Sequence, residues 1–546
     1  MRIFKNKSIH TYILFVLFIL TMCLSIKVTK RATNSMIEGD AASELVLSHN
    51  LSASHNILSH DWYYGSELRV FNTQIIFSFL FNFLNDWGKV RFYGTIFMHV
   101  ILLLSFTFMM RQANQSWASV IFGSILLLLP YCVAYGRIAL YQSFYLPHLT
   151  FGFLLPGLLF SVIRNCNNYK RIDCFLSLTA LFLISFLSCL NGIRYIAEIM
   201  LPVTLVYILN LLIRNRFTVS NDRKESALWY IALIGMIFFG FLGFLVNKRT
   251  LLTQYSAFNF SERILTIRTY FESSILQCIL HQFGFRTNIP MLSLVGILSL
   301  AGLFVCVYCF YLSFHSLQEN QASFNLFLMR QMMITCTACI VFEMYLIKGL
   351  EICTRYFISS SVWMIPLLCT YFDKFIEQKT LDIKKMSYIL CIATLLINGL
   401  LNMSYFLNPE GIAKQPYEGF EGIDASNPNL VRDLKRPMQF IVENQYEYGF
   451  APFWEASTIT EKTNGIPVSS VKVEKDQLIK INLLTLKSYD FIETDKVFLM
   501  LDVTNAQYFP DFDVSFQWKE IYRDNHYVIY DVNDLNQIRE YFIKNN

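Results

Sequence analysis

Charged residues are scarce in this sequence. Only 16% of its 546 residues are Asp, Glu, Lys or Arg, whereas 54% are hydrophobic. Soluble domains carry about 25% charged residues, so this composition excludes an ordinary soluble protein and predicts many membrane-spanning helices. Apolar runs such as 12–26, 96–110 and 231–246 approach the roughly 20 residues that cross the hydrocarbon core, and their flanks supply the rest.

Several motifs are also absent. The tail from Asn408 to Asn546 has no glycine-rich nucleotide loop, Walker sequence or serine-nucleophile elbow, so we expect no soluble nucleotide site there. That tail has no cysteine, and nearly all thirteen cysteines lie in or beside apolar runs, so no disulfide framework is expected. No internal repeat is evident, which argues against a secondary transporter because many transporters are built from repeats.

The apolar runs predict a polytopic α-helical membrane protein with about eleven transmembrane helices. The predicted spans are approximately 9–26, 89–110, 117–135, 143–163, 174–190, 195–213, 228–246, 289–312, 331–348, 355–373 and 386–406.

Loop charges orient these spans. With the N-terminus inside, every inside loop contains Lys or Arg, as the positive-inside rule requires. The odd number of spans then places residues 408–546 outside, together with large loops at 27–88 and 247–288 and a short loop at 136–142. We therefore expect a multi-pass protein of the cell membrane with a cytoplasmic N-terminus and an extracytoplasmic C-terminal domain.

The tail differs in charge from the rest of the chain. Residues 408–546 contain 14 Lys and Arg against 22 Asp and Glu, a net charge of −8, which leaves +13 for residues 1–407. We expect two domains divided at this point, a transmembrane domain and a soluble domain. Leu430–Tyr446 reads as a helix, and 468–473, 496–503 and 526–532 read as strands, so the tail is predicted to be an α/β module.

An acidic pair follows the first span. Asp40 and Glu44 are four residues apart, so on a helix their carboxylates share one face, flanked by Leu47 and Leu51. Such a helix suits the membrane surface, and paired carboxylates suit general-base chemistry, because one accepts a proton while the other shifts its pKa or orients a hydroxyl. The structural alternative is a helix start stabilised by acidic residues in its first turn.

The stretch from His60 to Arg69 mixes aromatic and hydrogen-bonding side chains. This mixture is typical of sites that stack on sugar rings and hold their hydroxyls, although Trp and Tyr also gather at any membrane interface. The candidate substrate-binding residues here are His60, Asp61, Tyr63, Tyr64, Glu67 and Arg69.

No metal or other cofactor is expected. His49, His55 and His60 lie near Asp61, which raises divalent metal binding as an alternative, but spacings of six and five match no familiar zinc signature. The pairs Cys306/Cys309 and Cys336/Cys339 have metal-like spacing. On membrane helices such small residues are expected at packing faces instead.

Basic residues recur in the predicted outer loops, against the positive-inside bias, so a negative group is expected to hold them there. A lipid phosphate is suitable because guanidinium groups bind phosphate bidentately and stabilise charge on a leaving phosphate. The structural alternative is ion pairing, of Arg194 with Glu198 and of Arg355 with Glu351. The candidate substrate-binding residues of this group are Arg137, Tyr141, Arg194, Arg249, Lys348, Arg355 and Tyr356.

These features resemble the GT-C superfamily of integral-membrane glycosyltransferases, which includes protein O-mannosyltransferases and the lipid A aminoarabinose transferase. The first outer loop carries an acidic residue, Asp40, a later outer loop is large, and Arg355-Tyr356 stands at the outer end of a late span before Pro366. The sequence more narrowly resembles poorly characterised bacterial members of that superfamily in four segments: 40–47, 61–64, 191–195 and 453–456.

The resemblance implies inverting transfer of a sugar from a polyprenyl-phosphate donor, with Asp40 as general base and Arg194 and Arg355 at the lipid phosphate. The chain has Asp40 and Glu44 apart where the mannosyltransferases have adjacent acids. The expected acceptor is a cell-surface glycan, cell-wall polymer, lipid or protein at the outer face, and membrane lipids but no nucleic acid are expected partners. The alternatives are a lipid-linked glycan transporter or flippase and a glycan polymerase or ligase.

Overall fold

The computed structural model describes most of the residues of the chain. These are 2–35, 37–65, 67–168, 170–214, 223–251, 273–285, 290–318, 324–346, 354–407, 434–474, 477–490, 492–503, 518–532, 535, 536 and 538.

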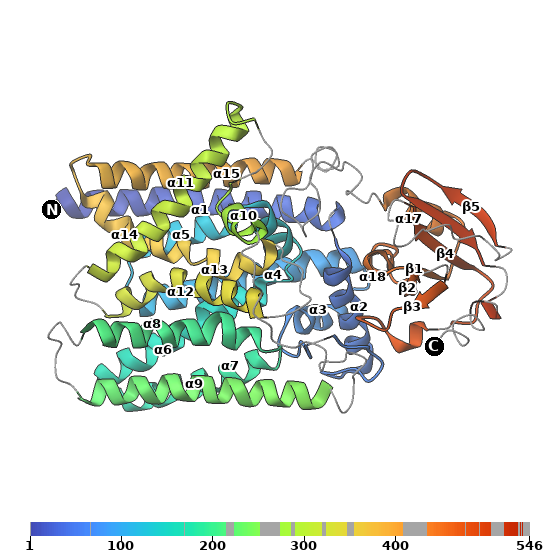
Figure 1. The fold of residues 1–546 in the computed structure, drawn as a ribbon, viewed down its shortest axis with the longest axis horizontal. Helices are drawn as coiled ribbons and strands as arrows, with labels where there is room; N and C mark the ends of the chain where they lie inside the picture. Colours follow the sequence, from blue (N-terminus) through green and yellow to red (C-terminus); the bar gives the residue numbers. More distant parts are fainter. Residues whose placement is uncertain are drawn as a thin grey trace.

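Long apolar helices lie side by side and form a bundle, with the C-terminal domain at one end (Figure 1). Seven helical segments in the described part of the chain are long and apolar enough to cross a membrane, which confirms a polytopic membrane protein. They belong to α1 (Arg2–Ser35), α4 (Trp87–Gln112), α6 (Leu146–Asn167), α7 (Arg171–Cys189), α9 (Arg223–Thr250), α11 (Leu294–Gln318) and α15 (Ile383–Leu407).

The other four expected spans are also helical. They correspond to α5 (Trp117–Leu128), to η2 (Ile196–Met200) with α8 (Leu201–Arg214), to α12 (Phe324–Leu346), and to η5 (Thr354–Phe357) with α13 (Ile358–Ser361) and α14 (Met364–Glu377). A short helix, α10 (Ser273–His281), precedes α11.

The expected span 117–135 and the expected loop 136–142 are both wrong in detail. Helix α5 ends at Leu128, because Pro130 disfavours helical backbone before it and cannot donate a helical hydrogen bond. The chain then forms a π-helix, η1 (Tyr135–Tyr141), which is largely buried instead of exposed as a loop. Short π-helical turns are rare in proteins, and those that occur are frequently found at functional sites.

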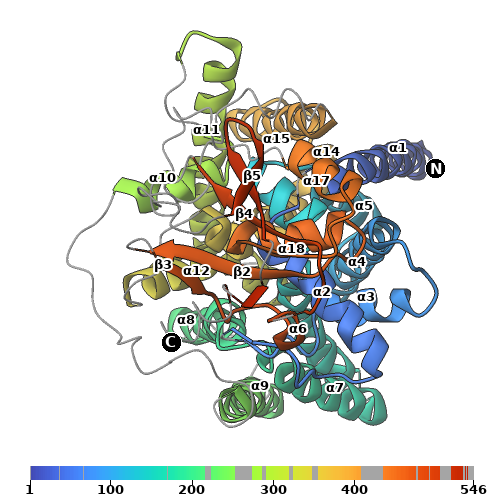
Figure 2. The ribbon, with the colours of Figure 1, turned by 90° about the vertical axis from the view of Figure 1, so that its right-hand side faces the viewer.

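The expected surface helix after the first span is also wrong in its environment. Helix α2 (Gly39–Ser54) does contain Asp40 and Glu44, but it packs against α3 (Thr73–Phe81) on one side and α18 (Phe453–Lys462) on another. The flanking Leu47 and Leu51 are buried with most of the helix. Helix α2 is therefore enclosed between the bundle and the C-terminal domain, as Figure 2 shows from that end.

The C-terminal domain is built on a mixed six-stranded sheet with strand order β3-β2-β1-β4-β6-β5. The central strand β1 pairs in parallel with β2 and β4, and the remaining pairs are antiparallel. The expected α/β module and its three strands are confirmed. The expected helix 430–446 corresponds to the shorter α17, and residues 430–433 lie outside the described residues, while β1, β3, β5, α18 and η7 are additional. The elements are α17 (Lys435–Glu443), β1 (Tyr448–Pro452), α18, β2 (Val468–Glu474), β3 (Gln477–Lys480), η7 (Lys487–Tyr489), β4 (Val497–Asp502), β5 (Lys519–Arg523) and β6 (Tyr527–Asp531).

A buried ion pair fixes this domain to the bundle. Arg91 of α4 is 0% exposed and donates two hydrogen bonds to Glu461 of α18, Nε to Oε1 at 3.1 Å and Nη2 to Oε2 at 2.6 Å. The same Nη2 donates to the carbonyl of Ala41 in α2 at 2.7 Å, and the guanidinium lies over the Phe77 ring. One side chain thus joins α4, α2, α3 and α18.

We expect Arg91→Ala to destabilise the docked domain by roughly 3–5 kcal/mol, because it leaves the Glu461 carboxylate buried without its partner. Thermal unfolding and limited proteolysis of the purified protein measure this. Arg523→Ala is the matched control, since its pair with Glu520 is exposed and contributes at most about 1 kcal/mol. Equal stability of the two variants would contradict this role for Arg91.

Candidate active site

The candidate site lies where the bundle meets the C-terminal domain, around the first turn of α2. Asp40 is 19% exposed at its side chain, and its Oδ2 lies 3.5 Å from Nη1 of Arg355, whose side chain is 15% exposed. The neighbouring Glu38, just before α2, pairs with Arg137 of η1. Three expected site residues, Asp40, Arg137 and Arg355, are therefore brought to one place from segments far apart in the sequence.

Tyr356 links two arginines. The guanidinium carbon of Arg194 lies 5.2 Å from the centroid of its ring, and that of Arg355 lies 5.4 Å from it. Both distances are within the range of cation–π attraction, which offsets part of the repulsion between two like charges held close together. The expected residues Arg194, Arg355 and Tyr356 thus form one cationic group that adjoins Asp40.

Arg194 is firmly held. Its Nε donates to Oε1 of Glu198 at 2.7 Å and its Nη1 donates to the Tyr145 hydroxyl at 3.0 Å. Glu198 itself is buried in η2, with Oε2 2.8 Å from Nε2 of His148 and in a hydrogen bond with the Ser359 hydroxyl. The expected ion pair between Arg194 and Glu198 is confirmed, whereas Glu351, the other expected partner, lies outside the described residues.

His148, Tyr145 and Ser359 are functional candidates that the sequence analysis missed. They lie at the start of α6 and in α13, inside apolar runs that read as packing segments. A histidine beside a helix-starting proline, Pro147, was the one available signal, and it does not by itself predict a carboxylate partner.

Glu44 is placed differently from Asp40. It is 2% exposed, Nη1 of Arg69 lies 2.9 Å from its Oε1, and the Thr73 hydroxyl donates to its Oε2. Burial raises the pKa of the Glu44 carboxyl above its ordinary value, although Arg69 and Thr73 counteract part of that rise. These contacts bury Glu44 against Arg69 and Thr73, whereas Asp40 is partly exposed, and the catalytic role of Glu44 stays a prediction.

Arg69 and Glu67 form an ion pair near the site. Arg69 has the left-handed φ of 52°, its guanidinium covers the Phe144 ring, and Nε lies 3.5 Å from Oε2 of Glu67. Glu67 in turn lies against Gly192, where an added Cβ would be 3.1 Å from Glu67 Cγ. Gly192 has φ of 109°, which side chains rarely adopt, so two constraints demand glycine there.

The segment 60–64 docks the C-terminal domain. Both carboxylate oxygens of Asp61 accept hydrogen bonds from Ser488, and Trp62 forms an antiparallel β-bridge with Leu486. The Tyr63 hydroxyl donates to Asp490 at 3.1 Å, and partial burial together with Asp490 raises the pKa of Tyr63 to about 12. Tyr64 is buried, and its hydroxyl accepts from the amide of Ser59. The contacts of this segment are thus interdomain and internal, although His60 is exposed.

Two further expected residues, Tyr141 and Arg249, have other surroundings. Tyr141 packs edge-on against Phe406 within the bundle, and Arg249 is exposed at the end of α9. Lys348 lies outside the described residues. Among the described residues, no group of three or more His, Cys, Asp or Glu side chains is arranged to hold a metal ion.

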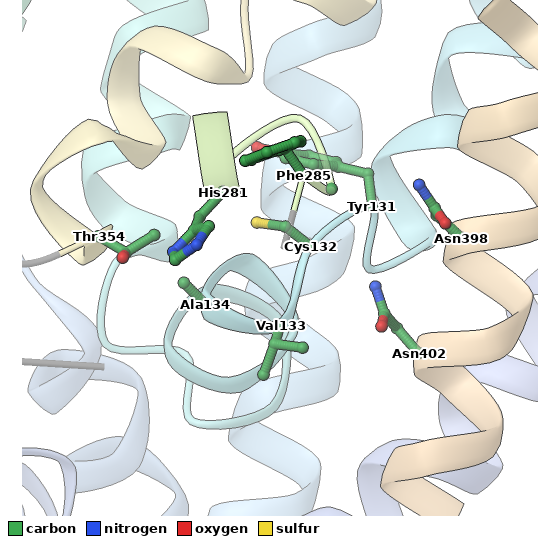
Figure 3. Close-up of a pocket in the computed structure, with 10 residues that line it drawn as sticks. Tyr131, Cys132, Val133, Ala134, His281, Phe285, Thr354, Asn398 and Asn402 are labelled. Atoms are coloured by element: carbon green, nitrogen blue, oxygen red, sulfur yellow. The ribbon is translucent and has the colours of Figure 1, made fainter. Parts of the chain in front are cut away.

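A small cavity with several polar lining residues lies beside Thr354, the residue that precedes Arg355 in the chain (Figure 3). It has a volume of about 30 Å³ and is lined by side chains that include His281, Thr354, Asn398 and Asn402. Asn398 is 7% exposed, and within the described part of the chain its Nδ2 has no hydrogen-bond partner. The cavity has room for an ordered water molecule. Such a water would accept a hydrogen bond from Asn398 Nδ2 and would lie near Thr354.

This arrangement of helices and C-terminal domain confirms the expected fold class, a polytopic α-helical membrane protein with a C-terminal α/β domain. The chain is similar to ArnT from Cupriavidus metallidurans bound to undecaprenyl phosphate, with a TM-score of 0.54, 10% identity, and coverage of 95% of this chain and 98% of ArnT. Apo ArnT gives a TM-score of 0.53, 10% identity, and coverage of 95% and 97%.

The apo oligosaccharyltransferase of Archaeoglobus fulgidus has a TM-score of 0.49 and 10% identity to this chain, over 96% of this chain and 75% of that protein. No protein-family model and no curated protein matches the sequence.

We expect Gly192→Ala to lower stability by roughly 1–3 kcal/mol, because alanine is strained at this φ and its Cβ presses on Glu67. Thermal unfolding in detergent measures the loss. Gly152→Ala in α6 is the matched control, since its added Cβ meets only Ile199 Cδ1 at 4.0 Å and alanine favours helix. A Gly192 variant as stable as the Gly152 variant would refute the strain argument.

Proposed function

We propose that this protein is a membrane glycosyltransferase that transfers a sugar from a polyprenyl-phosphate donor to a hydroxyl of a cell-surface glycan, cell-wall polymer, lipid or protein. The observation that carries the proposal is the position of the Asp40 carboxylate, 3.5 Å from an arginine that shares Tyr356 with a second arginine. A base and a phosphate-binding group of two guanidiniums therefore adjoin each other at one end of the bundle.

The proposed reaction is a single displacement. The acceptor oxygen attacks the anomeric carbon while its proton passes to Asp40, and the bond from that carbon to the phosphate oxygen breaks. The bonding electrons leave with polyprenyl phosphate, whose added negative charge Arg194 and Arg355 stabilise. Because attack and departure occur on opposite faces of the carbon, the step inverts its configuration. No metal and no other cofactor enters the step.

The two arginines have different tasks in this proposal. Arg194 is fixed by Glu198 and Tyr145 at 2.7 and 3.0 Å, so it is a preorganised anion site. Arg355 contacts Asp40 at 3.5 Å, a longer and weaker contact. Donor phosphate competes for Arg355, and its binding would release the Asp40 carboxylate to accept a proton.

The donor class agrees with three features. The tail has no nucleotide-binding motif, the cationic group lies at the end of a membrane bundle, and the similar ArnT structure contains undecaprenyl phosphate. We propose further that this end of the bundle, with residues 408–546, faces outside, as the positive-inside pattern favours.

Asp40→Asn is expected to lower sugar transfer by roughly 10²–10⁴-fold, because the amide cannot accept the acceptor proton. The assay supplies membranes with a panel of radiolabelled polyprenyl-phosphate monosaccharides and follows polyprenyl phosphate release and label in polymer, lipid or protein. Asp173→Asn, an exposed acid at the start of α7, controls for charge removal. Unchanged turnover of Asp40→Asn would exclude Asp40 as the base, and no turnover by wild type with any donor would favour a transporter.

Arg194→Lys and Arg355→Lys are each expected to reduce kcat/KM by roughly 10–100-fold, because lysine loses the bidentate contact with phosphate. The two variants should differ in stability. Arg194→Lys weakens the pairing of buried Glu198 and lowers the Tm, while Arg355→Lys leaves the Tm near wild type. Arg164→Lys, at the other end of α6, is the control for both measurements. Wild-type kcat/KM in both site variants would refute the phosphate-binding assignment.

A further inference from the structure

A second cavity opens at the end of the bundle away from the C-terminal domain. It has a volume of about 290 Å³ and lies between the last turns of α11, the last turns of α14 and the beginning of α15. Figure 1 shows α15 running toward the C-terminal domain, so its beginning lies at the opposite end, near the N-terminus. The cavity is lined by Tyr308, Tyr311, Leu312, His315, Tyr371, Lys374, Phe375, Gln378, Asp382 and Lys384.

The cavity is basic. Nζ of Lys384 lies 3.2 Å from Nε2 of His315, and Nζ of Lys374 lies 5.8 Å from the centroid of the Tyr371 ring. The guanidinium of the buried Arg330 contacts the same ring from the α12 side at 4.9 Å. Among the described lining residues Asp382 is the one acid, and its Oδ1 accepts a hydrogen bond from the backbone amide of Lys385 at the start of α15.

The contact between Lys384 and His315 has a consequence for ligand charge. The Lys384 ammonium group and the His315 ring converge at 3.2 Å on the wall of the cavity. An anion placed between them would form a charge-assisted contact with the ammonium group and accept a hydrogen bond from the imidazole N–H. A phosphate with its three or four oxygens suits this geometry.

An aromatic row leads from the cavity toward the middle of the bundle. Phe304 stacks on Tyr308, Tyr308 stacks on Tyr311, and Tyr311 meets the His315 ring edge-on. These residues are three or four apart and therefore share one face of α11. Tyr311 is partly exposed on this membrane-length helix, as is Val307 beside the row, so the row borders the lipid-facing surface.

We infer that this cavity binds the phosphate headgroup of an anionic glycerophospholipid from the leaflet opposite the C-terminal domain, with an acyl chain along the row of Phe304, Tyr308 and Tyr311. Tyrosines at a membrane interface and lysines beside it are common without a bound lipid. Here they enclose a cavity large enough for a headgroup, and its charge and its apolar exit match the two parts of one lipid. This site is independent of the proposed sugar transfer.

The test uses native mass spectrometry of the full-length protein, released from detergent after incubation with equimolar phosphatidylglycerol and phosphatidylcholine. The variant Lys374→Gln/Lys384→Gln removes both cavity lysines. The control Lys170→Gln/Lys379→Gln removes two exposed lysines from loops at the same end of the bundle. We expect wild type and control to retain phosphatidylglycerol in preference to phosphatidylcholine, and the cavity variant to bind it roughly tenfold more weakly.

Three outcomes would overturn the assignment. The first is equal phosphatidylglycerol binding by wild type and the cavity variant. The second is equal retention of the two lipids by wild type. The third is displacement of phosphatidylglycerol by an equal concentration of glycerol 1-phosphate, which would make the ligand a soluble phosphate. Circular dichroism and gel filtration of each variant establish that a loss of binding is not a loss of fold.

Discussion

A single buried guanidinium joins the membrane bundle to the C-terminal domain. Arg91 has no exposure to solvent, so its charge requires compensation inside the protein, and Glu461 of the C-terminal domain supplies it with two hydrogen bonds. Because the same side chain binds the carbonyl of Ala41, the residue after Asp40, the pair also fixes the first turn of α2. The position of Asp40 therefore depends on contacts made by the far end of the chain.

The two arginines of the candidate site are held differently, Arg194 by short hydrogen bonds and Arg355 by one longer ion pair. Arg194 is oriented by Glu198, which is itself held by His148 and Ser359, so the chain of contacts runs deep into the bundle. Arg355 has a longer contact with a more exposed carboxylate. Tyr356 lies against both guanidiniums and supplies an aromatic surface that keeps them together. In the proposed reaction, Arg194 is therefore the fixed contact for the donor phosphate and Arg355 is the contact that changes partner when the phosphate binds.

The sequence carried the coarse fold and part of the site. Hydropathy predicted the membrane helices because it depends on local residue type, whereas the orientation that loop charge favours and the domain boundary at residue 408 stay predictions. Asp40, Arg194 and Arg355 stood out because charge is unusual near apolar runs, and the structure brings them together, while their roles stay predictions. The environments of Glu44 and Asp61 were not found, since Arg69, Thr73 and Ser488 are partners set by tertiary packing. In the sequence, Arg91 looks like a residue at the edge of a span. Its burial depends on pairing with Glu461, which lies 370 residues later, and nothing local in the sequence indicates that pairing.

The separation of Arg91 and Glu461 in the sequence also implies a delay during protein synthesis. Glu461 is made 370 residues after Arg91, and Lys462, which donates to the carbonyl of Thr33 at the end of the first helix, follows directly. At about 5–20 residues per second, ribosomes need roughly 20–70 s to cover that distance. During this interval the early helices are in the membrane without the carboxylate and the ammonium group that complete them. The growing chain must therefore keep the Arg91 side chain hydrated or otherwise paired until α18 is made, and the first turn of α2 gains its final contacts only after that.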